Sequence, residues 1–170
     1  MNGDEKLITK ICIIGAGPAG ATTSIFLGKL GIEHVLVDAQ EFPRDKVCGD
    51  GLDLNVVRVL NHIDPDFIEN EMIRSPQNFT ASSGLRYILG NGNHVDIDGS
   101  NHESNNIKSV TKPIFFVAKR SHFDALLVSK IDRNITSLRL GTKITNIVKT
   151  ENRWKLTGVN SSGNLEIDAA

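Results

Sequence analysis

Cysteine, tryptophan and tyrosine are scarce in this chain. Only Cys12 and Cys48 occur among 170 residues, without a Cys-x-x-Cys pair or a mixed Cys/His cluster, which argues against structural zinc and a disulfide framework. HExxH and GxSxG motifs are also absent, so neither a zinc-protease site nor a nucleophile elbow is indicated. Trp154 and Tyr87 are single residues of their kind, and we interpret both as packing residues. We expect no metal site.

Neither sign of charge dominates the composition. Lys and Arg number 19 against 20 Asp and Glu, for a net charge of −1, which argues against a nucleic-acid partner and a polybasic membrane patch. The apolar run at residues 11–16 is too short for a signal peptide or a membrane-spanning helix. The sequence therefore predicts a cytoplasmic protein without a transmembrane segment. It leaves the oligomeric state open, as well as peripheral membrane contact of a longer protein.

The spacing of apolar residues predicts an α/β chain. A strand over 8–14, a helix over 18–30 and a strand over 33–37 form one βαβ unit with parallel strands. A second helix is expected over 53–63, and a third over 121–132, opened by a Ser-x-x-Asp capping box. The other expected strands cover 79–81, 85–89, 95–97, 114–118, 137–140, 143–150, 153–159 and 165–167. The last three suggest an antiparallel meander.

A glycine-rich loop joins the first predicted strand to the first helix. Gly15 permits a tight turn, Gly17 allows a close approach of backbone to a pyrophosphate, and Gly20 allows the helix to pack closely on the strand. Asp38 ends the second strand at the spacing of an acid that binds a ribose hydroxyl. The pattern fits FAD, NAD or NADP, although the carboxylate of Asp38 disfavours the 2′-phosphate of NADP.

A second motif follows this βαβ unit. Residues 42–51 read Phe-Pro-Arg-Asp-Lys-Val-Cys-Gly-Asp-Gly. Together with the Gly-x-Gly-Pro-Ala-Gly loop and the acid at 38, this segment resembles the geranylgeranyl reductase group of FAD-dependent oxidoreductases. That group belongs to the p-hydroxybenzoate hydroxylase-like class, which also holds flavin monooxygenases and halogenases. The resemblance is specific over residues 10–52 and looser over 114–150, where residues 117–124 are similar to the family's strand-Arg-x-x-Phe-Asp element.

The resemblance implies a set of FAD-binding residues. The loop would hold the pyrophosphate, Asp38 the adenosine ribose, and Arg44 and Arg120 the ribose, ribityl and phosphate region, while Ile144 lies in the segment that touches the adenine. Lys46, Val47, Cys48 and Gly49 would line the flavin ring, and the family's equivalent of Cys48 lies at the active site. Cys48 is therefore our candidate catalytic residue, although a role as a small apolar filler stays open. The complete predicted set is Gly15, Ala16, Gly17, Pro18, Ala19, Gly20, Asp38, Ala39, Arg44, Lys46, Val47, Cys48, Gly49, Arg120 and Ile144.

The resemblance also implies a fold and an activity. We expect a Rossmann-like FAD-binding domain over 1–75 and 119–170, interrupted by a β-rich substrate-domain insertion over 76–118. The implied reaction is reduction of carbon–carbon double bonds in an isoprenoid or lipid substrate by hydride transfer from reduced FAD, with NAD(P)H or ferredoxin as an undetermined external donor. A monooxygenase or halogenase is the alternative. The family's downstream acidic-glycine motifs are missing, which predicts a truncated chain and keeps a catalytically silent nucleotide-binding fragment open.

Overall fold

The computed structural model describes residues 5–48, 51–98 and 115–170. The chain divides into two units, one formed by Met1–Lys46 with Arg120–Ala170 and the other by Val47–Lys119. The division after residue 46 differs from the boundary after residue 75 expected from the sequence. The first unit therefore brings together two segments that are far apart in the chain.

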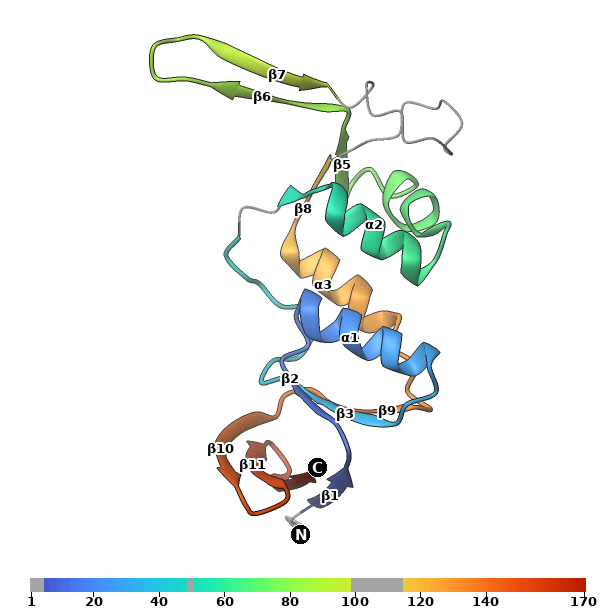
Figure 1. Ribbon diagram of the computed structural model, residues 1–170, viewed down its shortest axis with the longest axis vertical. Coiled ribbons are helices and arrows are strands. Elements are labelled where there is room, and N and C mark those ends of the chain that lie inside the picture. Colours follow the sequence, from blue (N-terminus) through green and yellow to red (C-terminus); the bar gives the residue numbers. More distant parts are fainter. Residues whose placement is uncertain (1–4, 49–50, 99–114) are drawn as a thin grey trace. The chain divides into compact units, whose positions relative to one another are not determined.

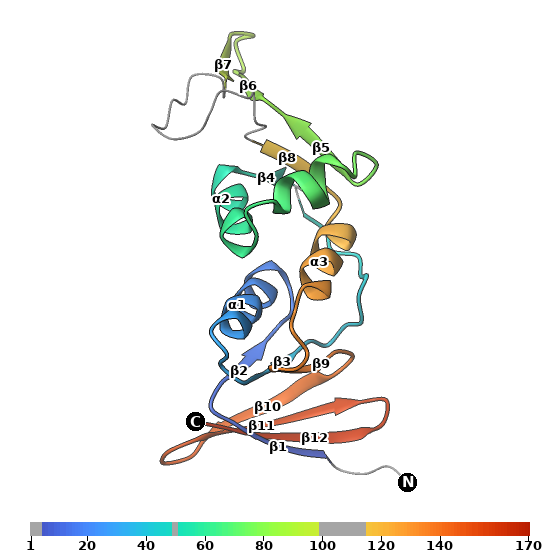
Figure 2. The ribbon, with the colours of Figure 1, turned by 90° about the vertical axis from the view of Figure 1, so that its right-hand side faces the viewer.

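A parallel sheet lies at the centre of the first unit (Figure 1). Its strand order is β2 (Cys12–Ile14), β3 (His34–Val37) and β9 (Thr136–Arg139), and both pairings are parallel. The helices α1 (Pro18–Lys29) and α3 (Arg120–Ser129) lie side by side on one face of this sheet (Figure 2). The βαβ unit expected from the sequence is confirmed, because α1 connects two parallel neighbours.

A four-stranded sheet forms the next layer of the first unit (Figure 2). Its order is β1 (Glu5–Thr9), β12 (Gly163–Ala169), β11 (Trp154–Asn160) and β10 (Lys143–Lys149). The last three strands form the expected antiparallel meander, whereas β1 joins it in parallel. The face of β3 opposite α1 packs on this sheet in one apolar cluster, formed by Val35, Val37, Leu156, Leu165, Ile167 and Ala169.

The single strand expected over 8–14 is divided in the structure. β1 ends at Thr9, and β2 starts at Cys12 in the other sheet. At the break, the hydroxyl of Thr9 donates to the carbonyl of Ile11 and accepts from its amide. The sequence does not reveal the division because both strands are short, and only Thr9 and Lys10 interrupt the apolar residues between Ile8 and Ile14.

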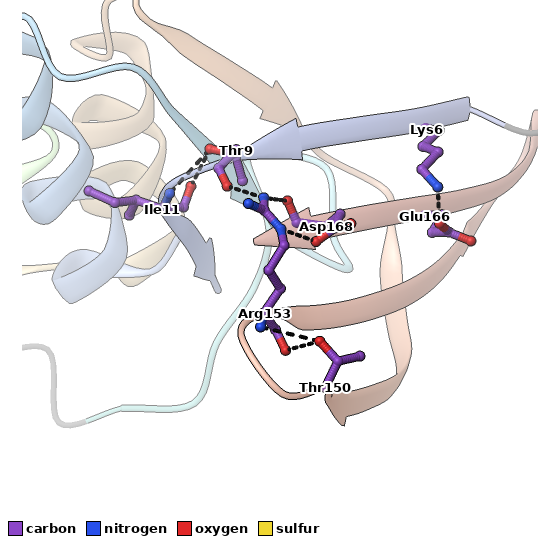
Figure 3. A network of polar contacts seen from close by, with 7 residues as sticks. All are labelled: Lys6, Thr9, Ile11, Thr150, Arg153, Glu166 and Asp168. Carbon is purple, nitrogen blue, oxygen red and sulfur yellow. Dashed lines mark hydrogen bonds and ion pairs between the residues drawn. The ribbon is translucent and has the colours of Figure 1, made fainter. Parts of the chain in front are cut away.

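Arg153 ties the strand ends around this break together (Figure 3). Its Nη2 donates to the carbonyl of Thr9 at 3.0 Å and to that of Asp168 at 2.8 Å, and its Nε pairs with the Asp168 carboxylate. Nearer the N-terminal end of β1, Lys6 pairs with Glu166 at 2.7 Å. Arg153 joins Thr9 of β1 to Asp168 of β12, and Lys6 of β1 pairs with Glu166 of β12. Both interactions therefore favour the observed parallel register.

The described residues of the second unit form two small sheets and two helical segments. One sheet has the order β4 (Gly51–Leu52), β8 (Phe115–Ala118), β5 (Phe79–Ser82), and β6 (Gly84–Ile88) pairs with β7 (His94–Asp98) in a hairpin. α2 (Leu54–Ile63) begins after Asp53, whose carboxylate accepts from the amides of Asn55 and Val56. The π-helix η1 (Ile68–Ile73) and β4 have no counterpart among the expected elements. Within the described residues, no helix is long and apolar enough to cross a bilayer.

Candidate functional site

The glycine-rich loop makes a sharp connection between β2 and α1. Gly15 has a φ of +100°, a conformation that side chains rarely adopt, and its amide donates to the carbonyl of Val37 at 2.7 Å. At Gly20, a Cβ would lie 1.8 Å from the carbonyl oxygen of Gly15. The glycine at position 20 is therefore required by the close packing of the helix on the turn.

Gly17 is the N-cap of α1, and Pro18 follows in the first turn. Because the first amides of a helix have no intrahelical acceptor, the amides of Gly17, Ala19 and Gly20 are potential donors to an anion. No acidic side chain occurs in this first turn. The local chemistry of the helix start therefore suits a phosphate group.

Two arginines from separate segments lie beside this helix start. A Cβ built on Gly17 would lie 3.5 Å from Nη2 of Arg44 and 3.9 Å from Nη2 of Arg120. Arg44 follows β3 in the chain, whereas Arg120 begins α3. The structure thus brings three of the predicted phosphate-binding residues to one place, although 27 and 103 positions separate Arg44 and Arg120 from Gly17 in sequence.

Asp124 holds both guanidinium groups. Its two carboxylate oxygens accept from Nε and Nη2 of Arg120 at 2.7 and 2.8 Å, and Arg44 lies 3.3 Å from the same carboxylate. The Asp124 side chain is fully buried, and the arginine side chains are 14% and 16% exposed. Arg44 also lies over the ring of Phe42, 5.0 Å from its centroid. Both arginines are therefore fixed by buried or stacked partners.

Asp124 did not enter the predicted set of site residues. Its place in the Arg-x-x-Phe-Asp element was visible, and an Arg–Asp pair four residues apart on a helix is a recognisable signal. The Ser-x-x-Asp pattern instead predicts a capping box that begins at Ser121. That interpretation was wrong, because α3 begins at Arg120 and the carboxylate of Asp124 faces arginine side chains.

Asp38 contacts the same loop from the end of β3. Its Oδ2 accepts from the amide of Ala16 at 2.7 Å, and its Oδ1 accepts from the amide of Gln40 at 2.8 Å. The residue is 9% exposed, whereas Ala39 is exposed. The carboxylate therefore orders the glycine-rich loop, and its predicted contact with a ribose stays a prediction.

The turn before β10 is attached to the segment that follows β3. The amide of Thr142 donates to the carbonyl of Asp38 at 2.8 Å, and the amide of Gly141 donates to that of Gln40 at 3.3 Å. Ile144 is partly buried, and its side chain packs against the apolar cluster between the two sheets. The predicted adenine-binding segment thus borders the Asp38 turn, and its contact with adenine stays a prediction.

The predicted flavin-lining residues fall at the division of the chain. Lys46 ends one segment of the first unit and is exposed, while Val47 and Cys48 belong to the second unit and are exposed as well. Gly49 lies outside the described residues. The assignment of all four residues to the flavin ring stays a prediction, as does a catalytic role for Cys48. Cys12 differs, since burial in β2 raises the pKa of its thiol to about 11.

A hollow of about 1120 Å³ opens elsewhere on the first unit. It is lined by residues 7–10, 31–35 and 133–139 together with Arg153. None of the predicted cofactor residues lines it, so the hollow is separate from the groups around the glycine-rich loop. Its size alone does not make it the functional site, because the groups suited to a phosphate converge at Gly17.

Residues 8–155 match the family of FAD binding domains. The chain belongs to this family. The match to this family extends over the glycine-rich loop, both arginines, Asp38 and the first strand of the meander, β10. A curated relative, menaquinone reductase of Mycolicibacterium smegmatis, is 43% identical over 53 residues, which are 31% of this chain and 13% of the relative.

Two crystal structures share the fold of this FAD binding domain. A p-nitrophenol 4-monooxygenase from Pseudomonas putida superposes with a TM-score of 0.74 and 15% identity, covering 97% of this chain and 40% of that chain. A geranylgeranyl bacteriochlorophyll reductase-like protein from Thermoplasma acidophilum has a TM-score of 0.73 and 15% identity, covering 96% and 38%. The Rossmann-like fold is thereby confirmed. The chain spans two fifths or less of the length of each of these proteins.

Proposed function

We propose that this FAD binding domain holds the FAD pyrophosphate at the N-terminus of α1, between the guanidinium groups of Arg44 and Arg120. The observation that carries the proposal is the convergence of both Nη2 atoms within 4 Å of a Cβ position on Gly17. Two guanidinium groups and the free amides of a helix start are the donors that a diphosphate needs.

The other predicted residues complete the proposed site. Asp38 contacts the adenosine ribose, the segment around Ile144 the adenine, and residues 46–49 the flavin ring. Ala39 lies next to the ribose-binding acid. Support for the first two assignments comes from the hydrogen bonds between Asp38 and Ala16 and between Thr142 and Asp38. These bonds place the acid, the phosphate loop and the start of the meander in contact.

We further propose that the reaction is a reduction of carbon–carbon double bonds in an isoprenoid or lipid substrate. When bound, FAD supplies a carrier that accepts hydride from a donor and passes it to a substrate; NAD(P)H and reduced ferredoxin are the candidate donors. Support comes from the motif at residues 42–51 and from the 43% identity with a menaquinone reductase over 53 residues, because menaquinone is a lipid with an isoprenoid chain.

A monooxygenase remains the second candidate. The monooxygenase fold superposes on this chain as well as the reductase-like fold does, with TM-scores of 0.74 and 0.73. A halogenase is an equal alternative, since the flavin-dependent halogenase CmlS also superposes with a TM-score of 0.74 and 21% identity. Dependence of product formation on O₂ separates the candidates: a reductase consumes donor and substrate without O₂, whereas the other two require it.

Titration of the 170-residue chain with FAD tests the proposal on the site. We expect a rise in melting temperature, because a ligand that binds only the folded state stabilises it by about 2.7 kcal/mol at a hundredfold excess over Kd. Riboflavin, which lacks phosphate, is the matched control and should give a much smaller rise. R44Q and R120Q should each weaken FAD binding about tenfold or more. An unchanged melting temperature with FAD would show that this chain does not form the proposed site.

A further inference from the structure

We propose that Asp124 is a positioning residue for diphosphate binding, which it serves by holding the guanidinium groups of Arg44 and Arg120 beside Gly17. This inference rests on the proposed function, since it concerns the same diphosphate site. It assigns a role to a residue that touches no ligand itself.

The contacts of Asp124 carry the argument. Its fully buried carboxylate binds Arg120 through two parallel hydrogen bonds of 2.7 and 2.8 Å, a geometry that fixes the plane of a guanidinium group. Arg44 reaches the same carboxylate at 3.3 Å. One acidic group thus controls two cations that come from segments 76 residues apart.

The arrangement leaves the cations suited to a further anion. The three side chains carry a formal charge of +1, so the carboxylate does not cancel both guanidinium groups. A single carboxylate that pairs with two like charges also offsets their mutual repulsion. Asp124 therefore lowers the local positive charge while keeping both cations in place.

Removing this carboxylate has two effects of opposite sign on the affinity for an anion, which makes the inference testable. If only net charge mattered, Asp124→Asn would raise the positive charge by one and tighten the binding of an anion. If positioning matters, the amide nitrogen of Asn faces a guanidinium donor, the bidentate pair is lost and binding weakens. The role of Asp124 as a positioning residue requires the second result.

The experiment measures binding of inorganic pyrophosphate and of FAD to the 170-residue chain by calorimetry. We expect D124N to weaken pyrophosphate binding about tenfold or more. Equal or tighter binding by D124N would overturn the inference, and so would a wild-type chain that does not bind pyrophosphate. A wild-type chain that binds pyrophosphate but not FAD would instead contradict the proposed function alone.

A second pair of variants separates positioning from a general loss of structure. In an R44Q/R120Q background no guanidinium group is left to position, so D124N should change the pyrophosphate affinity less than twofold. A persistent tenfold loss in that background would overturn the inference. If R44Q/R120Q fails to fold because it leaves a buried carboxylate unpaired, D124N is compared in the single R44Q and R120Q backgrounds, where its effect must shrink.

The chain also offers a matched control. Asp96 binds Arg86 with the same bidentate geometry, at 2.7 and 2.8 Å, in the exposed hairpin of the second unit. D96N removes an equivalent carboxylate from the second unit, whereas the glycine-rich loop belongs to the first. It should leave the pyrophosphate affinity unchanged within twofold. A loss as large as that of D124N would mean that the loss does not depend on the carboxylate beside Arg44 and Arg120, and would overturn the inference.

Discussion

At the scale of single residues, the two cysteines occupy opposite environments. Cys12 is half-buried in β2 and packs against the apolar cluster of the first unit. Cys48 is exposed. Because the thiolate is the reactive form, burial that raises a thiol pKa also protects the residue from alkylation.

We therefore predict selective alkylation of the native chain at pH 8. With a pKa of about 11, Cys12 carries only about one thiolate in a thousand molecules at that pH. Iodoacetamide should modify Cys48 and leave Cys12 intact, as read by peptide mass spectrometry. After denaturation in urea, both should react. Rapid modification of Cys12 in the folded chain would contradict its burial.

The same residue predicts a pH dependence of stability. Burial raises the pKa of Cys12 from 9.0 to about 11 in the folded state. The protonated thiol therefore contributes fully to the free energy of unfolding below pH 9, and this contribution is lost as the pH rises toward 11. The urea midpoint of the wild-type chain should fall between pH 8.5 and 10.5 by more than that of Cys12→Val. Equal slopes for the two proteins would exclude this contribution.

At the scale of elements, two glycines of α1 differ in how closely other atoms approach them. Gly20 faces the carbonyl oxygen of Gly15, where a Cβ would lie at 1.8 Å, whereas a Cβ on Gly28 would lie 3.7 Å from Cβ of Asp132. The distance at Gly20 is far shorter than van der Waals contact, whereas the distance at Gly28 is an ordinary van der Waals contact. Two glycines of one helix therefore differ in whether alanine fits.

We predict opposite effects of Gly20→Ala and Gly28→Ala on the free energy of unfolding. The first should cost more than about 3 kcal/mol, since either the turn or the helix must move. The second should be neutral or stabilise the chain by up to about 1 kcal/mol, because alanine favours a helix. Urea denaturation measures both. A small effect of Gly20→Ala would show that the close approach at the turn is absent.

The elements also show which parts of the structure the sequence could reveal. The βαβ unit and the meander follow from local patterns, because alternation of apolar residues and turn residues encode them directly. The division of residues 8–14 between two sheets depends on β12, whose residues lie 160 positions further along the chain than their partners in β1. Likewise, a local motif does not reveal that Arg44 is a partner of Asp124, and the residues around Asp124 by themselves also fit a capping box.

At the scale of the whole molecule, the first unit is assembled from the two ends of the described chain. Its sheets, its glycine-rich loop, and Arg44, Arg120 and Asp124 all belong to Met1–Lys46 or Arg120–Ala170. Arg44 and Arg120 share one carboxylate, so the two points at which the chain leaves and re-enters this unit lie near each other.

We predict that the first unit folds without residues 47–119. A Gly/Ser linker of roughly ten residues, with a root-mean-square span of about 17 Å, should replace them. Circular dichroism should show a cooperative unfolding transition, and pyrophosphate should bind within about threefold of the intact chain. A chain without a transition, or one that folds but does not bind, would mean that the excised residues contribute to the unit or to its site.

The parallel pairing of β1 with β12 has a consequence for synthesis of the protein. β1 comes from residues 5–9, yet its partner strand consists of residues 163–169. During translation, the N-terminal strand must wait until nearly the whole described chain has left the ribosome, and β3 must wait for β9. The glycine-rich loop is therefore among the first segments to be made and among the last to be supported by a complete sheet, which makes early occupation of its phosphate site by a nucleotide unfavourable.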